Sequence, residues 1–548
     1  MSETERAGLP PSPSETIINS ILPQDTPVHD IGPNLSEESP AESAPHLVDK
    51  TRGLLEADDG PSEHESQATQ LVKLGLSADL WHSSGGETFA TVTVGNHREN
   101  LPIRAKAFRQ HLARRFYEVE GGSVPGTQAI KDALNVLEAE ALFRGREHEV
   151  YVRVAGSGDS IYLDIGDPAW KAVEISPGGW RVVSDPPVHF RRSPGMLPLP
   201  EPEAGGSLDL LRPFVNAPED ASWTLMVSWL VAALRPVGPY PVLILQGEQG
   251  SAKTFTAKVL RALIDPNTAP LRGVPRDEHD LMIAARNGWV LGYDNLSGLP
   301  VWLSDALCRL ATGGGFATRE LYSDLEEILI EAKRPLVVNG IDDLSAREDL
   351  RDRGIILVLS PISEENRQEE EKLRTAFEAD RPRILGALLD AVAAALRNVP
   401  NVHLDKLPRM ADFATWIVAA EPARPWPAGA FLQAYSENRR DAVEAGLTNS
   451  RVAQAVIALA HAQKAPWSGT SSELLKALNT QVGKSGTEWI FSSGREEHSL
   501  PKSAQALSNK LRRNASALRS VGILVKFERR AHTRTIVIKK EGQHDDLQ

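Results

Sequence analysis

Cysteine is almost absent from this sequence of 548 residues, which contains only Cys308. A single thiol excludes a disulfide framework and any zinc site built from cysteine pairs, and such low usage is typical of reducing compartments. The sequence also lacks a run of about 18 apolar residues, and it does not begin with the basic-then-apolar order of a signal peptide. We therefore expect a soluble, cytoplasmic protein that does not enter a membrane.

Aromatic side chains are scarce in the first 66 residues, which are rich in Pro, Ser, Glu and Asp. These residues include 14 acidic and 3 basic side chains, a net charge of -11. Such a segment cannot bury enough apolar surface to offset the entropy lost on ordering. The sequence predicts a disordered acidic tail over 1–66, which could recruit an unknown protein.

Positive charge is concentrated near the other end of the chain, although the net charge of the whole is -13. Residues 501–540 hold 11 Lys and Arg side chains and one acid, Glu528. A basic helix over 502–520, a glycine turn and two strands joined by a basic turn have the outline of a winged-helix domain, which we place at 466–540. The expected DNA-binding residues are Lys510, Arg512, Arg513, Arg519, Arg529, Arg530 and Arg534.

Cationic side chains of this kind bind DNA mainly through backbone phosphates and give little sequence preference. The alternative is a solvated basic face, or one that docks on the acidic tail of its own chain.

The middle of the chain predicts a multidomain α/β protein. Residues 67–200 mix helical spacing with short alternating strands, which indicates an α+β domain of unknown role. Residues 208–400 alternate helices with apolar strands that look buried on both faces, as in a parallel sheet covered by helices. Residues 401–465 predict a helical segment.

One loop between a strand and a helix carries the clearest chemical signal. The sequence GEQGSAKT follows the apolar run Val242–Leu245 and fits the phosphate-binding pattern G-x-x-x-x-G-K-[ST], except that Ala252 replaces the last glycine. In such a loop Lys253 contacts the β- and γ-phosphates and the Thr254 hydroxyl binds Mg²⁺. The residues expected to bind ATP are Gly247, Gln249, Gly250, Ser251, Ala252, Lys253, Thr254 and Phe255.

Three further polar positions follow at the ends of apolar runs. Asp294 comes directly after 289–293 and would hold Mg²⁺ together with Thr254. Asn295 stands where a water-activating glutamate is common, and an amide can orient a water molecule but cannot take its proton. Asn339 ends another apolar run, where it can sense a γ-phosphate and position the attacking water.

Other acids and arginines complete the candidates. Glu326 and Glu327 are alternative general bases. Arg353, and less favourably Arg351, precedes a buried strand, where an arginine can reach the γ-phosphate of a neighbouring subunit. A metal site at Asp164 and Asp167 is also conceivable, although acids at strand ends are usually turn formers.

In this order the motifs resemble those of superfamily 3 helicases, AAA+-type ring ATPases of phages, plasmids and large DNA viruses. GEQGSAKT is similar to their Walker A motif, WVLGYDN to Walker B and PLVVNG to the sensor motif. The segment LATGGGFATRELYSDLEEILIEAKRP is similar to one that in relatives forms the hairpin lining the central channel, and LRDRGIILVL is similar to the family's arginine-then-strand ending. The resemblance covers about 210–365, and the whole chain also looks like ATP-binding proteins of prophages and integrative elements.

The resemblance implies ATP hydrolysis with Mg²⁺ by a homo-hexamer that translocates on DNA. It also implies that Arg353 is the arginine finger and that Arg319, Lys333 and Arg334 could face DNA in the channel. The resemblance does not extend to primase activity, because cysteine motifs typical of primases are absent.

The sequence therefore favours an ATP-dependent DNA helicase or translocase of the type that replicates mobile genetic elements. The alternative is a nucleotide-dependent DNA-binding switch with slow or no hydrolysis, used in an initiation or defence assembly, because Asn295 replaces the usual glutamate. An ATP-driven remodeller of proteins is a third, weaker hypothesis.

Overall fold

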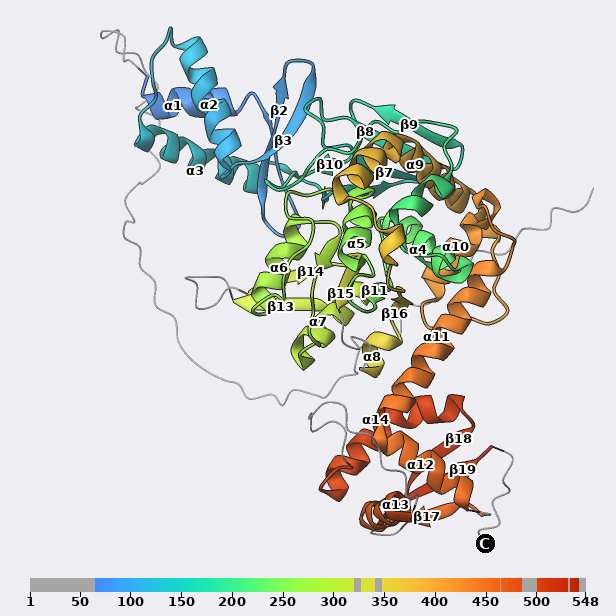
Figure 1. Cartoon of the computed structure of the whole chain (residues 1–548). Coiled ribbons are helices and arrows are strands. Elements are labelled where there is room, and N and C mark those ends of the chain that lie inside the picture. Colours follow the sequence, from blue (N-terminus) through green and yellow to red (C-terminus); the bar gives the residue numbers. More distant parts are fainter. Residues whose placement is uncertain are drawn as a thin grey trace, which may run out of the picture. The chain divides into compact units, whose positions relative to one another are not determined.

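The computed structural model describes residues 65–319, 327–340, 347–463, 465–484, 500–530 and 533–541 (Figure 1). Nearly all of the predicted acidic tail, 1–64, lies outside these residues. The described part is a multidomain α/β protein with a central parallel sheet. Among the described helices, none combines the length and the apolar character needed to cross a bilayer.

The central sheet has four parallel strands in the order β12-β15-β11-β16. Their bounds are Leu291–Tyr293 for β12, Leu336–Gly340 for β15, Val242–Gln246 for β11 and Gly354–Val358 for β16. The register places Leu245 opposite both Asn339 and Leu357, so the carboxyl ends of these strands form one edge. The four apolar runs predicted as strands of a parallel sheet are therefore confirmed.

Helices cover both faces of this sheet, which explains why its strands are apolar throughout. Leu243 and Leu245 of β11 pack in the largest hydrophobic core, while Val242 and Ile244 pack in a second core on the other face. The helices of the first core include α4 (Asp220–Ala233), α5 (Lys253–Ala262), α9 (Glu370–Asn398) and α10 (Ala411–Ala420). Those of the second are α6 (Glu278–Asn287) and α7 (Val301–Thr312).

On the open edge of β16, a side chain of α11 (Ala430–Asn449) forms hydrogen bonds with the strand's backbone. The Asn438 side-chain oxygen accepts a hydrogen bond from the N–H of Ile356 at 3.1 Å, and its amide nitrogen donates to the Ile356 carbonyl at 2.5 Å. An unpaired strand edge is a template for aggregation, and this asparagine replaces the missing neighbour at that point.

The region predicted as one α+β domain, 67–200, is divided between two large cores, and it also holds a small cluster of Ala155, Tyr162, Ala172, Val188 and Phe190. The first joins the sheet β3-β2-β1-β4 to three helices. Its elements are α1 (Gln67–Gly75), β1 (Asp79–His82), β2 (Thr88–Val94), β3 (His97–Pro102), α2 (Lys106–Val119), α3 (Thr127–Phe143) and β4 (Arg146–Glu147). Two short strands, β5 (Val150–Tyr151) and β10 (His189–Phe190), form a separate pair.

The second core to which this region contributes is the largest core, which also contains residues of the central sheet and its helices. An antiparallel meander, β6-β7-β8-β9, contributes Val154, Leu163 and Val173 to the largest core, beside α4 and α9. Its strands are β6 (Val154–Ser157), β7 (Ser160–Asp164), β8 (Ala172–Ser176) and β9 (Gly179–Val183). The domain boundary near 200 therefore does not separate two hydrophobic cores.

A buried ion pair also joins the meander to the central sheet. Arg153 is fully buried, and its Nε donates to Asp265 at 3.1 Å. The other carboxylate oxygen of Asp265 accepts hydrogen bonds from the N–H groups of Trp289 and Val290, just before β12. The pair thus fixes the start of the strand that leads to Asp294.

Two strands extend from the second face of the core as an antiparallel hairpin, β13 (Gly315–Arg319) and β14 (Glu327–Glu331) (Figure 1). They pair from Gly315 opposite Glu331 to Arg319 opposite Glu327. A short helix, α8 (Glu348–Arg351), precedes β16. The remaining short turns are η1 (Leu208–Phe214), η2 (Glu364–Asn366), η3 (Val399–Asn401) and η4 (Glu421–Ala423).

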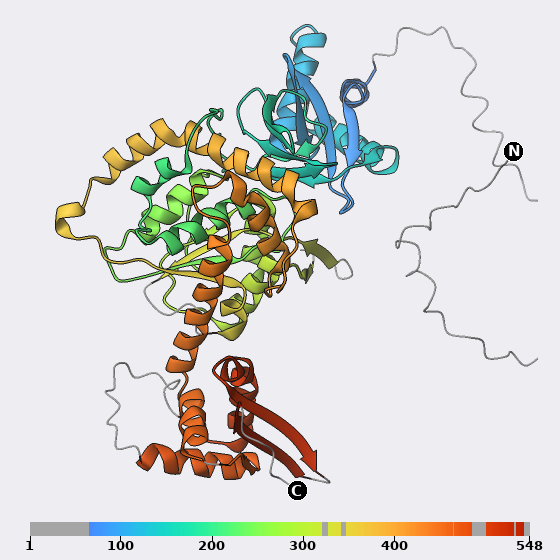
Figure 2. The same ribbon diagram turned by 90° about the vertical axis from the view of Figure 1, so that its right-hand side faces the viewer.

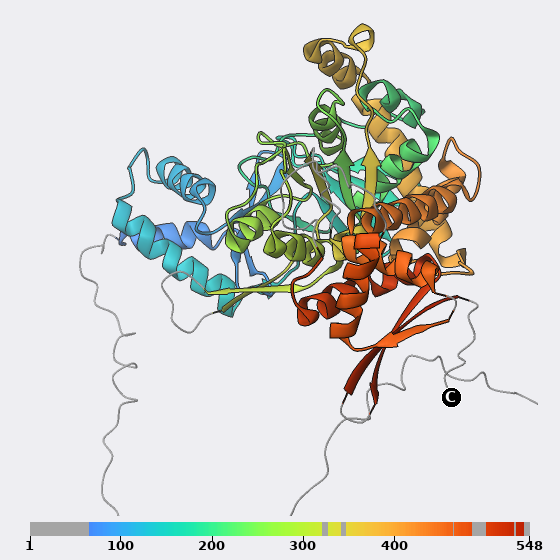
Figure 3. The same ribbon diagram turned by 60° about the horizontal axis from the view of Figure 1, so that its bottom comes forward.

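The C-terminal region has its own core and the order helix, strand, two helices, two strands. These are α12 (Arg451–Ala462), β17 (Trp467–Gly469), α13 (Ser471–Lys484), α14 (Ala504–Ser520), β18 (Ile523–Arg530) and β19 (Thr533–Lys540). The strands form an antiparallel sheet in the order β17-β19-β18, and β18 and β19 form a long ribbon (Figures 2 and 3). The predicted basic turn is shorter than expected, because Arg529, Arg530 and Arg534 lie within these strands.

Candidate nucleotide-binding site

The phosphate-type loop connects β11 to α5 at the carboxyl edge of the sheet, and two of its glycines are required by geometry. Gly247 has a φ of 150°, and a Cβ there would lie 2.3 Å from the carbonyl oxygen of Leu359. Gly250 has a φ of 84°, in the region that favours glycine. The chain can make this turn only with residues that lack a side chain at these points.

Ala252 adopts the left-handed conformation that the missing glycine would adopt. Its φ is 56° and its ψ is 26°, directly before the first residue of α5. An L-residue in this region costs about 1–2 kcal/mol relative to a right-handed helical conformation. The substitution therefore preserves the path of the loop at a modest cost in conformational energy.

The ammonium group of Lys253 lies inside the loop. Its Nζ donates to the carbonyl oxygens of Gly247 at 2.8 Å and Glu248 at 2.7 Å, and to the Ser251 hydroxyl at 3.2 Å. Burial lowers the pKa of Lys253, while the nearby carboxylate of Asp294 opposes that shift. A buried cation at a helix N-terminus is well suited to bind an anion.

Asn216, which precedes α4, braces the loop from outside. Its side-chain amide donates to the carbonyl oxygens of Ser251 at 3.0 Å and Ser360 at 2.7 Å. A second brace runs from the N–H of Ile362 to the carbonyl of Gly250 at 3.1 Å. Asn216 was not predicted from the sequence, because an asparagine far from a motif gives no local signal of its role.

The two residues predicted to hold Mg²⁺ are in direct contact. The hydroxyl of Thr254, on the first turn of α5, donates to Asp294 Oδ1 at 2.9 Å. Asp294 follows β12, whose neighbour in the sheet is β15. A hydroxyl and a carboxylate oxygen at this distance are hard oxygen ligands of the type that Mg²⁺ prefers.

Asn339 is the last residue but one of β15, lies beside this pair and is almost fully buried. Its side-chain oxygen accepts a hydrogen bond from the N–H of Asn295 at 3.0 Å. Its Nδ2 is buried and has no hydrogen-bond partner among the described residues. A buried donor without a partner is costly, so the site fits a ligand oxygen that would accept from it.

The arginine predicted to act on a neighbouring subunit lies at the other end of the sheet. Arg353 precedes β16, and its carbonyl accepts from the N–H of Val242 at the start of β11. At about 3.3 Å per residue this places it roughly 20 Å from its own phosphate-type loop. Its guanidinium is half-buried and contacts Asp349.

Arg351, the other candidate, is buried and packs closely against Gly446 of α11. It therefore lacks the accessibility that a contact with another subunit requires.

The remaining loop residue, Gln249, is exposed. Phe255 follows Thr254 and lines a cavity of about 680 Å³ together with Val259 and Phe377.

Arg334, predicted to face DNA, instead has its side chain inside the protein. Its Nε donates to the carbonyl oxygens of Ala285 and Gly288, its guanidinium lies 5.2 Å from the Trp289 ring, and burial lowers its pKa. The prediction failed because the strand β15 begins just after it, which draws the side chain against α6. Lys333 is half-buried beside Gly313.

Three predicted residues lie outside what the structure describes. Glu326 is outside the described residues altogether, and Arg319 and Glu327 are described only in their backbones. Their roles as DNA contacts or bases stay predictions.

The acids at the end of β7 have structural partners. Asp164 is buried and accepts from Arg192 at 2.6 and 3.0 Å and from the N–H of Gly166. Asp167 accepts from the N–H of Lys171 at 2.8 Å. Both carboxylates thus form a turn and an ion pair, as the alternative interpretation had it.

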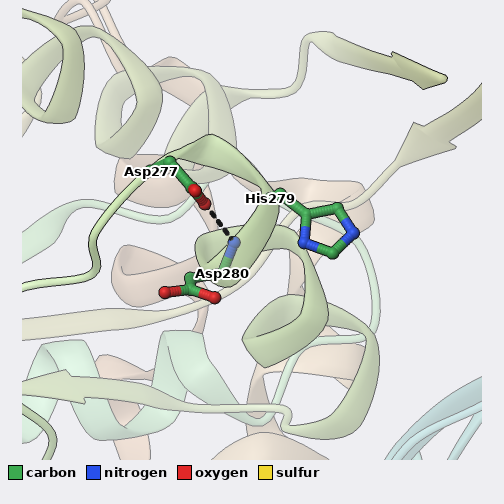
Figure 4. A group of neighbouring side chains, drawn as sticks. All are labelled: Asp277, His279 and Asp280. Carbon is green, nitrogen blue, oxygen red and sulfur yellow. Dashed lines mark hydrogen bonds between the residues drawn. The ribbon is translucent and has the colours of Figure 1, made fainter. Parts of the chain in front are cut away.

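A second group of possible metal ligands is explained by a helix end. Asp277, His279 and Asp280 lie close together at the exposed start of α6 (Figure 4). The Asp277 side chain accepts from the N–H of Asp280 at 2.8 Å, which is an N-cap, and Asp280 pairs with Arg276. The cluster is therefore an ordinary helix cap.

The basic residues of the C-terminal region are exposed. Lys510, Arg512, Arg513 and Arg519 project from α14, and Arg529 and Arg534 lie on the two-stranded ribbon. The side chain of Arg530 is outside the described part. Exposed cations on a helix and an adjacent ribbon can contact phosphates.

Two family models match the chain in succession. Residues 208–441 match "Actinomycete integrative conjugative element replication protein", and residues 452–546 match "AICE RepA C-terminal domain". Their boundary falls near the junction of α11 and α12. Over both regions the chain is similar to replication proteins of a mobile element. No curated protein matches it.

Solved structures share the fold only distantly. One, titled "SCCmec type IV Cch - active helicase", has a TM-score of 0.46 and 11% identity, covering 83% of this chain and 90% of that one. Another, titled "The A form apo structure of NrS-1 C terminal region-CTR", has a TM-score of 0.36 and 11% identity, covering 87% and 100%. At this distance neither structure bears on the function of this chain.

Proposed function

Given the matches to two regions of mobile-element replication proteins, we propose that this chain is an Mg²⁺-dependent ATPase that acts on DNA as a helicase or translocase. One observation carries the proposal. Thr254 and Asp294 lie 2.9 Å apart at the edge of the sheet where Lys253 begins α5 and Asn339 is the last residue but one of β15. These four side chains supply a lysine for the phosphates, two oxygen ligands for Mg²⁺ and an amide near the attacking water, which are recurring parts of phosphoryl transfer from ATP.

Each side chain has a distinct task. Lys253 exchanges its bonds to loop carbonyls for bonds to phosphate oxygens, and the loop N–H groups add further donors. Thr254 and Asp294 would hold Mg²⁺, which supplies neutralising charge between the phosphates. The unpartnered amide of Asn339 donates to the attacking water or to the γ-phosphate.

The general base is the weak point of the site. Asn295 is exposed and carries an amide, so it can orient a water molecule without deprotonating it. This favours slow intrinsic hydrolysis that DNA or a neighbouring subunit accelerates. The second candidate function, a nucleotide-dependent DNA-binding switch, rests on the same residue and requires tight ATP binding with negligible turnover.

We further propose a homo-hexameric ring in the cytoplasm, with Arg353 serving the site of the adjacent subunit. The distance between Arg353 and its own phosphate-type loop supports action between subunits. The order of elements in 451–540, which adds α12 of the same core to the predicted bounds 466–540, and its sheet β17-β19-β18 support a winged-helix domain that binds DNA. The tail's partner would be a protein.

The test is steady-state ATP hydrolysis with Mg²⁺, with and without single-stranded and forked DNA. We expect turnover that rises with DNA and disappears in Lys253→Ala, whereas the matched surface variant Lys131→Ala on α3 keeps it. Tight ATP binding without turnover on any DNA would favour the switch. Absence of ATP binding in the unmodified chain would contradict both functions.

A further inference from the structure

The exposed side of α14 differs from a simple basic face. The helix buries Leu507, Leu511 and Leu518 in the C-terminal core. At about 3.6 residues per turn, the stripe opposite to these leucines and the equally buried Ala517 is uncharged. It consists of Gln505, Asn509, Ser516 and Ser520, all of which are exposed. The centre of the exposed side therefore carries amides and hydroxyls.

Cations lie on both flanks of this stripe. Arg512 and Arg519 fall on one side of it, and Lys510 and Arg513 fall on the other. All four are exposed. A helix that only attracted phosphates would gain most from cations at its centre, where approach to DNA is closest. In α14 the centre of the exposed side instead carries uncharged side chains that donate and accept hydrogen bonds.

We propose that α14 enters the major groove of duplex DNA and reads base edges through Gln505 and Asn509. The groove is about 12 Å wide and admits one α-helix, so the central stripe would face the bases and the flanks would face the two phosphate walls. Asn and Gln bind adenine through paired hydrogen bonds to its N6 and N7. The ligand is thus duplex DNA of a defined sequence that contains adenine.

The surroundings hold α14 firmly in this orientation. The side-chain amide of Asn514 donates to the Ser450 hydroxyl at 2.8 Å, and that hydroxyl also caps α12. The guanidinium of Arg512 lies over the Phe527 ring of β18 at 4.0 Å, which fixes one flank against the ribbon. The rotation of the helix is therefore set before DNA arrives.

The two side chains proposed to contact bases, Gln505 and Asn509, are also free to bind a ligand. The side chains of Gln505 and Asn509 have no hydrogen bond or ion pair with any other residue in the described part of the chain. On the ribbon, exposed Arg529 and Arg534 pair on the face that carries Phe527 and extend the cationic surface beyond the helix. Phosphate contacts there would position the domain without adding sequence information.

This inference rests on the proposed action on DNA, and it adds a sequence preference that phosphate contacts alone do not supply. It assigns two roles to neighbouring residues. Gln505 and Asn509 determine which duplex is bound, whereas Arg534 of the ribbon sets how strongly any duplex is bound. The two roles can be separated by experiment.

The experiment selects bound molecules from a pool of random DNA duplexes with the full-length chain at fixed salt. We expect an enriched sequence. Asn509→Ala and Gln505→Ala should bind that sequence about tenfold to a hundredfold more weakly and bind unselected duplex as before. Arg534→Ala, the matched control, should weaken both equally and lower the salt dependence by about one phosphate contact.

Two results would overturn the inference. One is a chain that binds duplex but enriches no sequence, and the other is an unchanged enriched sequence in the double variant of Gln505 and Asn509. Circular dichroism melting verifies that these exposed substitutions leave the fold intact. ATP hydrolysis tests the proposed function separately, because its absence would contradict the ATPase while an enriched sequence would still support base recognition.

Discussion

The side-chain oxygen of Asn339 accepts a hydrogen bond from the backbone N–H of Asn295, so the end of β15 holds the loop that follows β12. Asn295 has a φ of 55°, in the left-handed region that asparagine tolerates better than most residues. The same bond turns the Asn339 amide nitrogen away, where it has no partner among the described residues. One side chain thus sets a backbone conformation and presents a donor at the edge of the sheet.

Asn339→Ala removes that donor, and we expect it to lower ATP hydrolysis by about a hundredfold to a thousandfold, as the loss of one preorganised donor does elsewhere. ATP affinity should change much less, because Lys253 and the loop N–H groups remain. Hydrolysis and equilibrium ATP binding would be measured on the same preparation. A variant that hydrolyses at the unmodified rate would remove Asn339 from the mechanism.

Ala252 permits a second prediction, based on its φ of 56°. Ala252→Gly relieves the left-handed strain but gives the unfolded chain more freedom, so we expect a change in stability within about 1 kcal/mol. Ala252→Val places a β-branched residue in the same conformation and should cost about 1–3 kcal/mol and weaken ATP binding. The measurements are thermal melting and nucleotide titration. Equal behaviour of both variants would mean that the loop does not hold this conformation.

The buried pair of Arg153 and Asp265 predicts a large loss of stability. Arg153→Leu leaves a buried carboxylate and several carbonyl oxygens without their donor, and we expect about 3 kcal/mol or more to be lost. Arg181→Leu breaks an exposed pair with Glu174 and should cost less than about 1 kcal/mol. Urea unfolding followed by tryptophan fluorescence compares the two. Similar losses would show that burial does not strengthen the contribution of Arg153.

The features that could be predicted from the sequence are those that a local pattern of residues determines. The four apolar runs became parallel strands because both faces of that sheet are covered, and the polar side chains at their carboxyl ends met because parallel strands share one edge. The sequence did not predict contacts made across the chain. Asn216 braces a loop 35 residues away in the sequence, and Arg334 turns inward toward carbonyls of α6, neither of which any local spacing records.

The division of 67–200 among separate cores escaped prediction for a related reason. Alternating strands indicate that one face is buried, but they do not say against what. The meander β6–β9 buries its face against α9, and Trp180 donates to Asp390 of that helix at 2.9 Å. Which helix packs against a sheet depends on residues far away in the sequence, so a local pattern does not reveal it.

Arg353 gives the last prediction, which concerns subunits rather than a single chain. Arg353→Ala should retain ATP binding and lose hydrolysis by about a thousandfold or more, as removal of an arginine finger does in related chemistry. Arg409→Ala, which removes another arginine near this end of the sheet, should keep hydrolysis, because Arg409 pairs with Asp352 within the same chain.

Mixing two inactive variants tests whether the arginine acts between subunits. Arg353→Ala retains an intact nucleotide site, and Lys253→Ala retains an intact arginine, so a mixed assembly contains some interfaces with both parts. If Arg353 serves the neighbouring site, the mixture should regain part of the unmodified hydrolysis rate, and the gain should depend on the mixing ratio. If Arg353 serves its own site, every interface of the mixture remains defective. A mixture as inactive as its components would therefore contradict action between subunits, provided that the two variants are shown to assemble together.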